Sequence, residues 1–131
     1  MKKAGILNAQ LSKVVAEMGH KDMLTISDVG LPIPDSTKRI DIALTRGIPG
    51  FIDTFKAIMG DLVVEKVIMA VEIKELSKEI HQEIIEILGE IPIDYYSHDQ
   101  FKELTGKTKA VVRTGEITPY ANIILVSGVN F

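Results

Sequence analysis

The sequence predicts an α/β fold: a single three-layer domain in which a mixed β-sheet carries helices on both faces. Segments with helical spacing of apolar residues alternate with short apolar runs through most of the chain, as expected for strand–helix units. The run over 66–71 is almost wholly apolar, which is typical of a strand covered on both faces. Two further strand-like segments end the chain. Its 131 residues fit one domain over residues 1–131.

The first half of the chain alternates helix and strand signals. The first helix is expected to begin after Asn8, whose side chain can cap it, and to end at Gly19 in a left-handed conformation. Strands are predicted over 23–26 and 39–44, each followed by a loop that contains proline or glycine. A helix over 51–59 then precedes the strand at 66–71.

The second half repeats this order and closes with strands. A helix over 77–88 carries an apolar stripe, and Gly89 is expected to stop it. A short strand follows over 91–95. Ser97 and Gln100 form a capping-box pattern that opens a helix over 98–105, which Gly106 ends. Strands over 111–112 and 121–126 complete the predicted sheet.

Charge and composition exclude several classes of function. The 15 basic and 18 acidic residues are interspersed and give a net charge of -3, so we expect no nucleic acid partner and no anionic membrane surface. The absence of cysteine removes disulfides, thiolate metal sites and a thiol nucleophile. The apolar stretch near the N-terminus is short for a signal peptide, and no stretch approaches the roughly 18 residues of a membrane helix. We therefore expect a cytoplasmic protein.

Several catalytic motifs are incomplete. The segment Thr105–Thr108 is similar to the end of a P-loop, but Phe101 stands where that motif needs glycine. No Gly-x-Ser-x-Gly nucleophile elbow occurs. Close pairs of metal ligands such as His-x-x-x-His are also missing, so we expect no metal and no cofactor. A three-ligand site made of His20, His98 and Asp28 remains an open alternative.

The segment Thr118–Asn122 is the most informative for function. Pro119 favours an extended entry into the last strand, and residues two apart on an extended segment face the same side. Tyr120 and Asn122 would thus present a hydroxyl and an amide together, without net charge. This pair suits a neutral polyhydroxylated ligand, although a solvated tyrosine and a turn-forming asparagine would leave the same pattern.

The three histidines have different settings. His20 follows a helix end, and the strand after it could return Asp28 to the imidazole, which would favour the protonated ring. An ordinary ion pair would look the same. His98 is expected at the first helical position after Ser97, where the helix dipole favours a neutral ring that can bond a hydroxyl group. His81 lies in an amphipathic helix and is expected to have no chemical role.

These segments carry a family resemblance over essentially the full chain. In order and spacing, they resemble the ribose pyranase and L-fucose mutarotase family: 3–8, Met18–His20, Ser27–Pro32, Arg39–Gly47, Tyr96–His98 and Arg113–Asn122. The resemblance implies an isomerase that interconverts the six- and five-membered ring forms of free D-ribose without a cofactor.

The resemblance also implies roles for individual residues. His20 matches the family's proton donor, while the sugar-binding positions correspond to Asp28, His98, Tyr120, Ala121 and Asn122. Histidine at position 98 favours ribose, because the fucose branch tends to place arginine near there. The assembly it implies is a homodecamer of two stacked five-membered rings, and a positive mean hydropathy fits extensive subunit burial.

Two alternative functions remain open. One is a mutarotase that exchanges only anomers, for example of L-fucose. The other is a non-catalytic sugar-binding accessory of ribose transport. Because His20 and Tyr120 are separated by most of the chain, the site could lie within one subunit or between two; we expect the second arrangement.

Overall fold

The computed structural model describes residues 1–131 and is built around a six-stranded sheet of order β2-β5-β1-β6-β3-β4. Only β6 runs antiparallel to its neighbours, and the other paired strands are parallel. The predicted mixed sheet is therefore confirmed. Its strands are β1 (Met23–Ser27), β2 (Arg39–Asp41), β3 (Val64–Ala70), β4 (Ile93–Tyr96), β5 (Val111–Arg113) and β6 (Ile123–Ser127).

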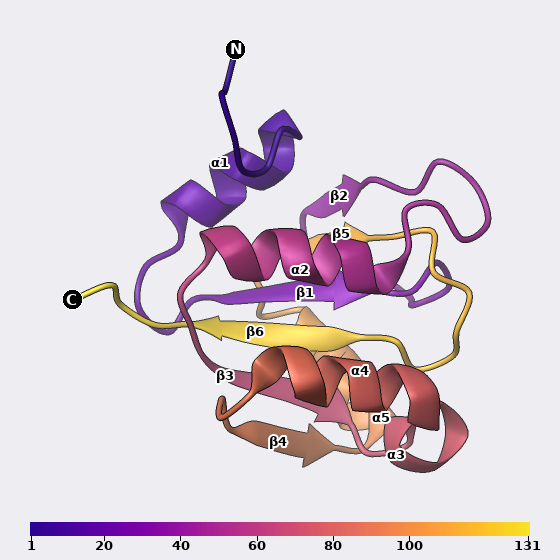
Figure 1. Ribbon diagram of the computed structural model, residues 1–131. Helices are drawn as coiled ribbons and strands as arrows, with labels where there is room; N and C mark the ends of the chain where they lie inside the picture. Colours follow the sequence, from indigo (N-terminus) through magenta and orange to yellow (C-terminus); the bar gives the residue numbers. More distant parts are fainter.

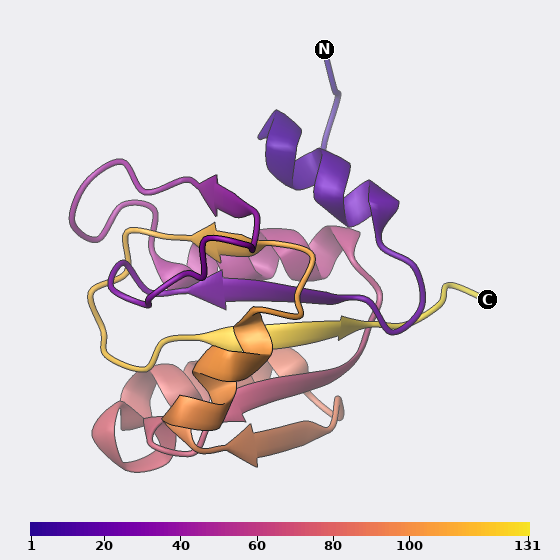
Figure 2. The same cartoon turned by 180° about the vertical axis from the view of Figure 1, so that it is seen from behind.

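Helices cover both faces of this sheet, as predicted. Figure 1 shows α2 and α4 in front of the sheet, and Figure 2, seen from behind, shows α5 crossing the other face. Helix α1 lies beside the sheet near the N-terminus, and α3 precedes α4. No helix has the length and apolar character needed to cross a membrane. The helices are α1 (Ala9–Glu17), α2 (Phe51–Asp61), α3 (Ile73–Leu76), α4 (Lys78–Leu88) and α5 (His98–Thr105).

The core has two parts, one on each face of the sheet. In β6, Ile123 and Leu125 belong to the large cluster that also contains the buried apolar residues of α2 and α4, whereas Ile124 and Val126 pack in the smaller cluster with Phe101 of α5. Successive side chains of a strand point to opposite faces. Apolar residues are therefore needed at every position, which explains the unbroken apolar runs.

The helix caps agree with the sequence except at one glycine. Asn8 accepts a hydrogen bond from the Leu11 N–H at 2.9 Å, and both bonds of the Ser97–Gln100 capping box form. The prediction that Gly19 is left-handed is wrong. α1 ends at Glu17, the following residue Met18 is extended, and the positive φ of 72° occurs at Lys21. Residues 19–22 form a tight turn, and Lys21, its third residue, takes the left-handed conformation.

Other boundaries also differ from the prediction. The strand expected over 39–44 ends at Asp41, whose carboxylate accepts the Ala43 N–H at 3.1 Å and so competes with a strand ladder. The short helix α3 has no sequence signal of its own. Strand β3 begins two residues earlier than predicted, at Val64.

The topology brings one end of all six strands to the same edge of the sheet. The strands β1, β2, β3, β4 and β5 end there, and the antiparallel β6 begins there. Asp28, Glu116 and His98 follow strands that end at this edge, and Tyr120 precedes β6. Open α/β sheets bind ligands at the carboxyl ends of their parallel strands. We call this the carboxyl edge, and the opposite one the amino edge.

Candidate active site

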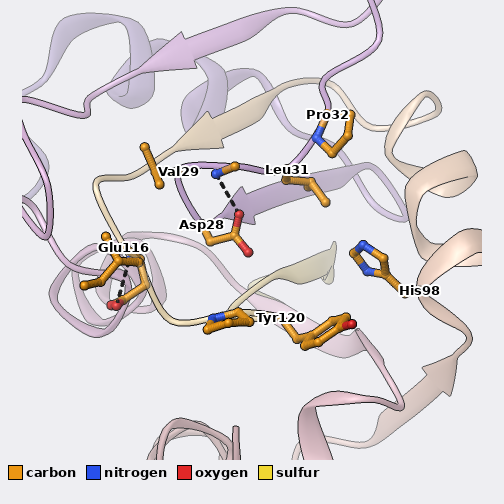
Figure 3. Close-up of a pocket in the computed structure, with 10 residues that line it drawn as sticks. Asp28, Val29, Leu31, Pro32, His98, Glu116 and Tyr120 are labelled. Atoms are coloured by element: carbon orange, nitrogen blue, oxygen red, sulfur yellow. Dashed lines mark hydrogen bonds between the residues drawn. The ribbon is translucent and has the colours of Figure 1, made fainter. Parts of the chain in front are cut away.

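A cavity of about 340 Å³ opens at the carboxyl edge. Its walls are the loop 28–32 after β1, the loop 116–120 before β6, and the first residue of α5, His98. In Figure 3, Asp28 lies across the cavity from His98 and Tyr120. Three of the predicted site residues thus face one space, although they come from distant parts of the chain.

Asp28 is held in place by two partners. The Gly30 N–H donates to Oδ1 at 2.9 Å, and the Asn122 side-chain amide donates to Oδ2 at 3.1 Å. In return, the Asp28 N–H donates to the Asn122 Oδ1 at 2.8 Å. Each carboxylate oxygen can accept a further hydrogen bond from a ligand hydroxyl.

Asn122 itself is fully buried and does not line the cavity. The reason is the backbone of Tyr120, whose φ of 62° is left-handed rather than extended. The Asn122 N–H donates to the Tyr120 carbonyl at 2.8 Å and closes a tight turn. The prediction that Tyr120 and Asn122 face the same side is therefore wrong: one faces the cavity and the other supports Asp28.

Ala121 lies between them, and its side chain is buried in the large core cluster. It does not line the cavity either. Its N–H donates to the Thr118 carbonyl at 3.3 Å and helps to close the turn. Only a backbone role in the site is available to Ala121.

His98 is the first residue of α5 and presents an unused ring nitrogen. Its backbone N–H donates to both carboxylate oxygens of Glu72, at 2.9 and 3.2 Å. The ring packs edge-on against Tyr120, with centroids 5.0 Å apart. The buried Nδ1 has no hydrogen-bond partner within the chain. Because a buried polar atom normally has a partner, this nitrogen is suited to a ligand hydroxyl.

Glu116 lines the cavity and was missed as a site residue by sequence reasoning. It accepts the Phe51 N–H at the start of α2 at 3.0 Å, together with hydrogen bonds from Ile117 and Thr118. Burial alone would raise the pKa of Glu116, but these hydrogen bonds outweigh it and hold the pKa below its ordinary value. No sequence signal links this glutamate to a helix start 65 residues away.

His20 lies apart from the cavity, at the amino edge. It precedes β1, whereas Asp28 follows that strand, so the two occupy opposite ends of it. The expected contact between His20 and Asp28 within one chain is wrong, because β1 runs straight between β5 and β6 and cannot return the chain. The His20 ring instead meets Glu65 of β3, with Nε2 and Oε2 2.9 Å apart.

This separation has consequences for the other histidine predictions. His20, His98 and Asp28 of one chain cannot bind one metal ion, and no three residues of the types His, Cys, Asp and Glu cluster in the structure. His81 lies outside the cavity on α4, with its Nε2 2.7 Å from the Tyr95 hydroxyl. Burial lowers the pKa of His81.

Comparison with known proteins agrees with the geometry. The model of the RbsD / FucU transport protein family matches residues 1–130. The chain belongs to this family. D-ribose pyranases of Coprothermobacter proteolyticus and Clostridium perfringens are 54% and 53% identical to it over 131 residues, covering 100% of each chain.

Two solved structures of sugar complexes are similar to this chain. The structure of Bacillus subtilis RbsD complexed with D-ribose is similar with a TM-score of 0.97 and 49% identity, covering 100% of both chains. The fucose mutarotase of Streptococcus pneumoniae, in complex with L-fucose, has a TM-score of 0.79 and 24% identity, covering 95% of each chain. The second likeness shows a common fold alone.

Proposed function

We propose that the protein interconverts the pyranose and furanose forms of free D-ribose as a cofactor-independent isomerase. The full-length identity to D-ribose pyranases supports this assignment. The observation that carries it is the cavity shared by Asp28, His98 and Tyr120, which is lined by no lysine or arginine. Such a lining offers acceptors and donors to hydroxyl groups and offers no cation to a phosphate. It therefore fits a free sugar better than a sugar phosphate.

The reaction needs two proton transfers for ring opening, two more for ring closure, and no redox step. Opening the pyranose delivers a proton to the ring oxygen while the bond from that oxygen to the anomeric carbon breaks. The anomeric hydroxyl loses its proton as the carbonyl forms. A different hydroxyl then attacks the carbonyl carbon and loses its proton, while the carbonyl oxygen takes one up, and the furanose closes. We assign the first proton to His20, because an imidazole ring can both give and take a proton, and we assign the second to the Asp28 carboxylate. One positioned acid–base group typically contributes ~10²–10⁴-fold.

We further propose that His20 reaches the cavity from a neighbouring copy. Within one chain it lies at the amino edge, away from the cavity. Exposed apolar side chains mark both edges. Val63 and Val129 line the hollow around His20, whereas Leu44 and Ile117 lie in loops of the carboxyl edge and Leu76 ends α3 there. Contact between two different surfaces is head-to-tail, and it closes into a ring when the rotation from copy to copy completes a full turn. This arrangement supports the homodecamer of two five-membered rings that the family resemblance implies.

The cellular setting follows from the same proposal. We place the protein in the cytoplasm, where free ribose from uptake is used. We treat residues 1–131 as one functional domain, because residues from both halves of the chain line the cavity.

Saturation-transfer NMR on D-ribose tests the function directly. We expect the protein to accelerate transfer between pyranose and furanose signals, and His20→Ala to abolish this without changing the circular dichroism spectrum. Exchange should survive exhaustive chelation and dialysis. Transfer between anomers alone would instead indicate a mutarotase, and ribose binding without any transfer would indicate a sugar-binding accessory. Either result would contradict the proposal.

A further inference from the structure

The loop that carries His20 is held by backbone bonds on both sides. The Lys21 N–H donates to the Ser127 carbonyl at 2.9 Å, and the Ser127 N–H donates to the Asp22 carbonyl at 2.8 Å. Within the loop, the Gly19 N–H donates to the Asp22 carboxylate at 2.9 Å. The backbone of His20 is thus fixed against the end of β6. What remains to be set is the orientation of its imidazole ring.

Glu65, the partner of that ring, projects from an irregularity in β3. Val64 pairs with Ser127 and Lys66 pairs with the adjacent Val126, so Glu65 is an extra residue without a cross-strand partner. A bulge of this kind redirects a side chain, and bulges are common beside active sites. The sheet is therefore distorted at the one position whose carboxylate meets the His20 ring.

The surroundings of Glu65 favour a fixed, ionised carboxylate. A Cβ on Gly128 would lie only 3.2 Å from the Glu65 Cβ, so the glycine leaves room for the glutamate stem. The Lys21 ammonium bonds one carboxylate oxygen and the His20 ring bonds the other. Those two hydrogen bonds, that of Lys21 first, hold the pKa of Glu65 below its ordinary value.

We propose that Glu65 is a positioning residue for His20: it accepts the Nε2 hydrogen, so that Nδ1 is the nitrogen that exchanges a proton with the sugar. The inference rests on the proposed function, in which His20 is the proton donor. In the protonated ring, Nδ1–H gives its proton to the sugar ring oxygen as the bond to the anomeric carbon breaks. The neutral imidazole that remains keeps its hydrogen on Nε2, directed at Glu65.

An ordinary surface ion pair is the competing explanation. The His20 side chain is 49% exposed in the single chain, and exposed pairs contribute little. In the proposed assembly, however, the neighbouring copy's cavity covers this edge. Removing water strengthens a charge-assisted bond, so the contact would hold the ring during catalysis.

Three variants separate the two explanations. Glu65→Ala removes the acceptor, and Glu65→Gln keeps an acceptor oxygen without the charge. Asp94→Asn is the matched control, because it breaks another ion pair of β3, that of Lys66 with Asp94 at 3.0 Å. For each variant, saturation transfer at several ribose concentrations gives kcat and KM. NMR of ¹⁵N-histidine protein reports the hydrogen-bonded Nε2–H of His20 in the same samples.

We expect Glu65→Ala to lower kcat by about 10–100-fold, as misplacement of a catalytic group does, with KM nearly unchanged because Glu65 lies outside the cavity. Glu65→Gln should fall between this variant and the wild type. The Nε2–H signal should be lost in Glu65→Ala and kept in Asp94→Asn. Wild-type kcat in Glu65→Ala, or an unchanged Nε2–H signal, would overturn the proposal.

Failure of the proposed function would look different. A wild-type protein without ring exchange would contradict that function, while the NMR signal would still report whether Glu65 holds the His20 ring. If Glu65→Ala does not assemble, the kcat of Glu65→Gln decides: a value equal to that of Asp94→Asn would contradict a positioning role.

Discussion

Asp28 and Asn122 form one unit at the scale of single residues. Their side chains and the Asp28 N–H are joined by two mutual hydrogen bonds, one of which satisfies a fully buried amide. The carboxylate that faces the cavity is therefore oriented by a buried residue that lies behind the cavity wall. A mutation behind the cavity should change both stability and sugar binding.

We expect Asn122→Ala to lower the free energy of unfolding by about 1–3 kcal/mol, because the Asp28 N–H loses its acceptor. It should also raise the KM for ribose, since Asp28 is no longer held toward the cavity. Chemical denaturation at fixed protein concentration and saturation transfer measure the two effects. Gln82→Ala, which removes an exposed amide on α4, is the control and should change stability by less than about 0.5 kcal/mol. Equal stability of the two variants would be evidence against this role.

Glu116 makes a prediction about pH. Its pKa is lower in the folded protein than in the unfolded chain, so folding favours the ionised form. Its contribution to stability is complete above the unfolded value of about 4.3, and it is lost as the pH falls through the lower folded value. The difference in unfolding free energy between wild type and Glu116→Gln should follow this course. A difference that stays constant from neutral pH to strong acid would contradict it.

At the scale of elements, the loop after β2 packs against the turn after β5 through a glycine. A Cβ on Gly115 would lie 2.6 Å from the carbonyl oxygens of Thr45 and Ile48, which are backbone atoms that cannot move aside cheaply. The Gly115 carbonyl also accepts the Gly47 N–H at 2.6 Å. This contact supports the wall of the cavity that continues into Glu116.

Gly115→Ala should therefore destabilise the protein by about 1–3 kcal/mol, as overpacking does, and should reduce ring exchange. Gly60→Ala is its opposite: this glycine lies in α2 with nothing within 4 Å of an added Cβ. There the change should stabilise the protein by up to about 1 kcal/mol. Thermal unfolding of both variants checks the contrast. If both substitutions changed the stability in the same direction, the close approach of backbone atoms to Gly115 would not be what restricts that position to glycine.

A feature of this structure could be predicted from the sequence when the residues that form it are close together in the chain. The Asn8 cap and the Ser97–Gln100 capping box were predictable because each is closed within a few residues. The left-handed conformation of Tyr120 was not, because the tight turn and the bonds to Asp28 override an extended reading. The contact of His20 with Glu65 spans 45 residues and depends on the strand order, which apolar patterning does not reveal.

The same distinction applies to the site. Asp28, His98 and Tyr120 meet because chain direction brings the ends of parallel strands and the start of an antiparallel strand to one edge. Their convergence could be predicted once each was placed at a strand or helix end. His20 lies at the opposite edge because it precedes β1, whereas Asp28 follows that strand. This could be predicted only once β1 is known to cross the sheet without turning back.

At the scale of the whole molecule, the proposed assembly predicts what fraction of active sites stays intact when two variants are mixed. In a site between subunits, His20 and Asp28 come from different copies. Random mixing of His20→Ala and Asp28→Asn subunits in equal amounts then gives about a quarter of the sites both wild-type residues. Each parent alone is expected to be inactive, so recovered exchange near this fraction of the wild-type rate would support the intersubunit site.

A second mixture tests the same geometry, and here a site within one chain would leave more intact sites than a site between subunits. When the double variant His20→Ala/Asp28→Asn is mixed equally with wild type, an intersubunit site again leaves about a quarter of the sites intact, whereas a site within one chain leaves about half. Differently tagged subunits, purified in tandem, verify that mixed oligomers have formed, and saturation transfer measures the exchange. Mixed oligomers of the single variants that stay inactive, together with half activity in the second mixture, would place the whole site in one chain.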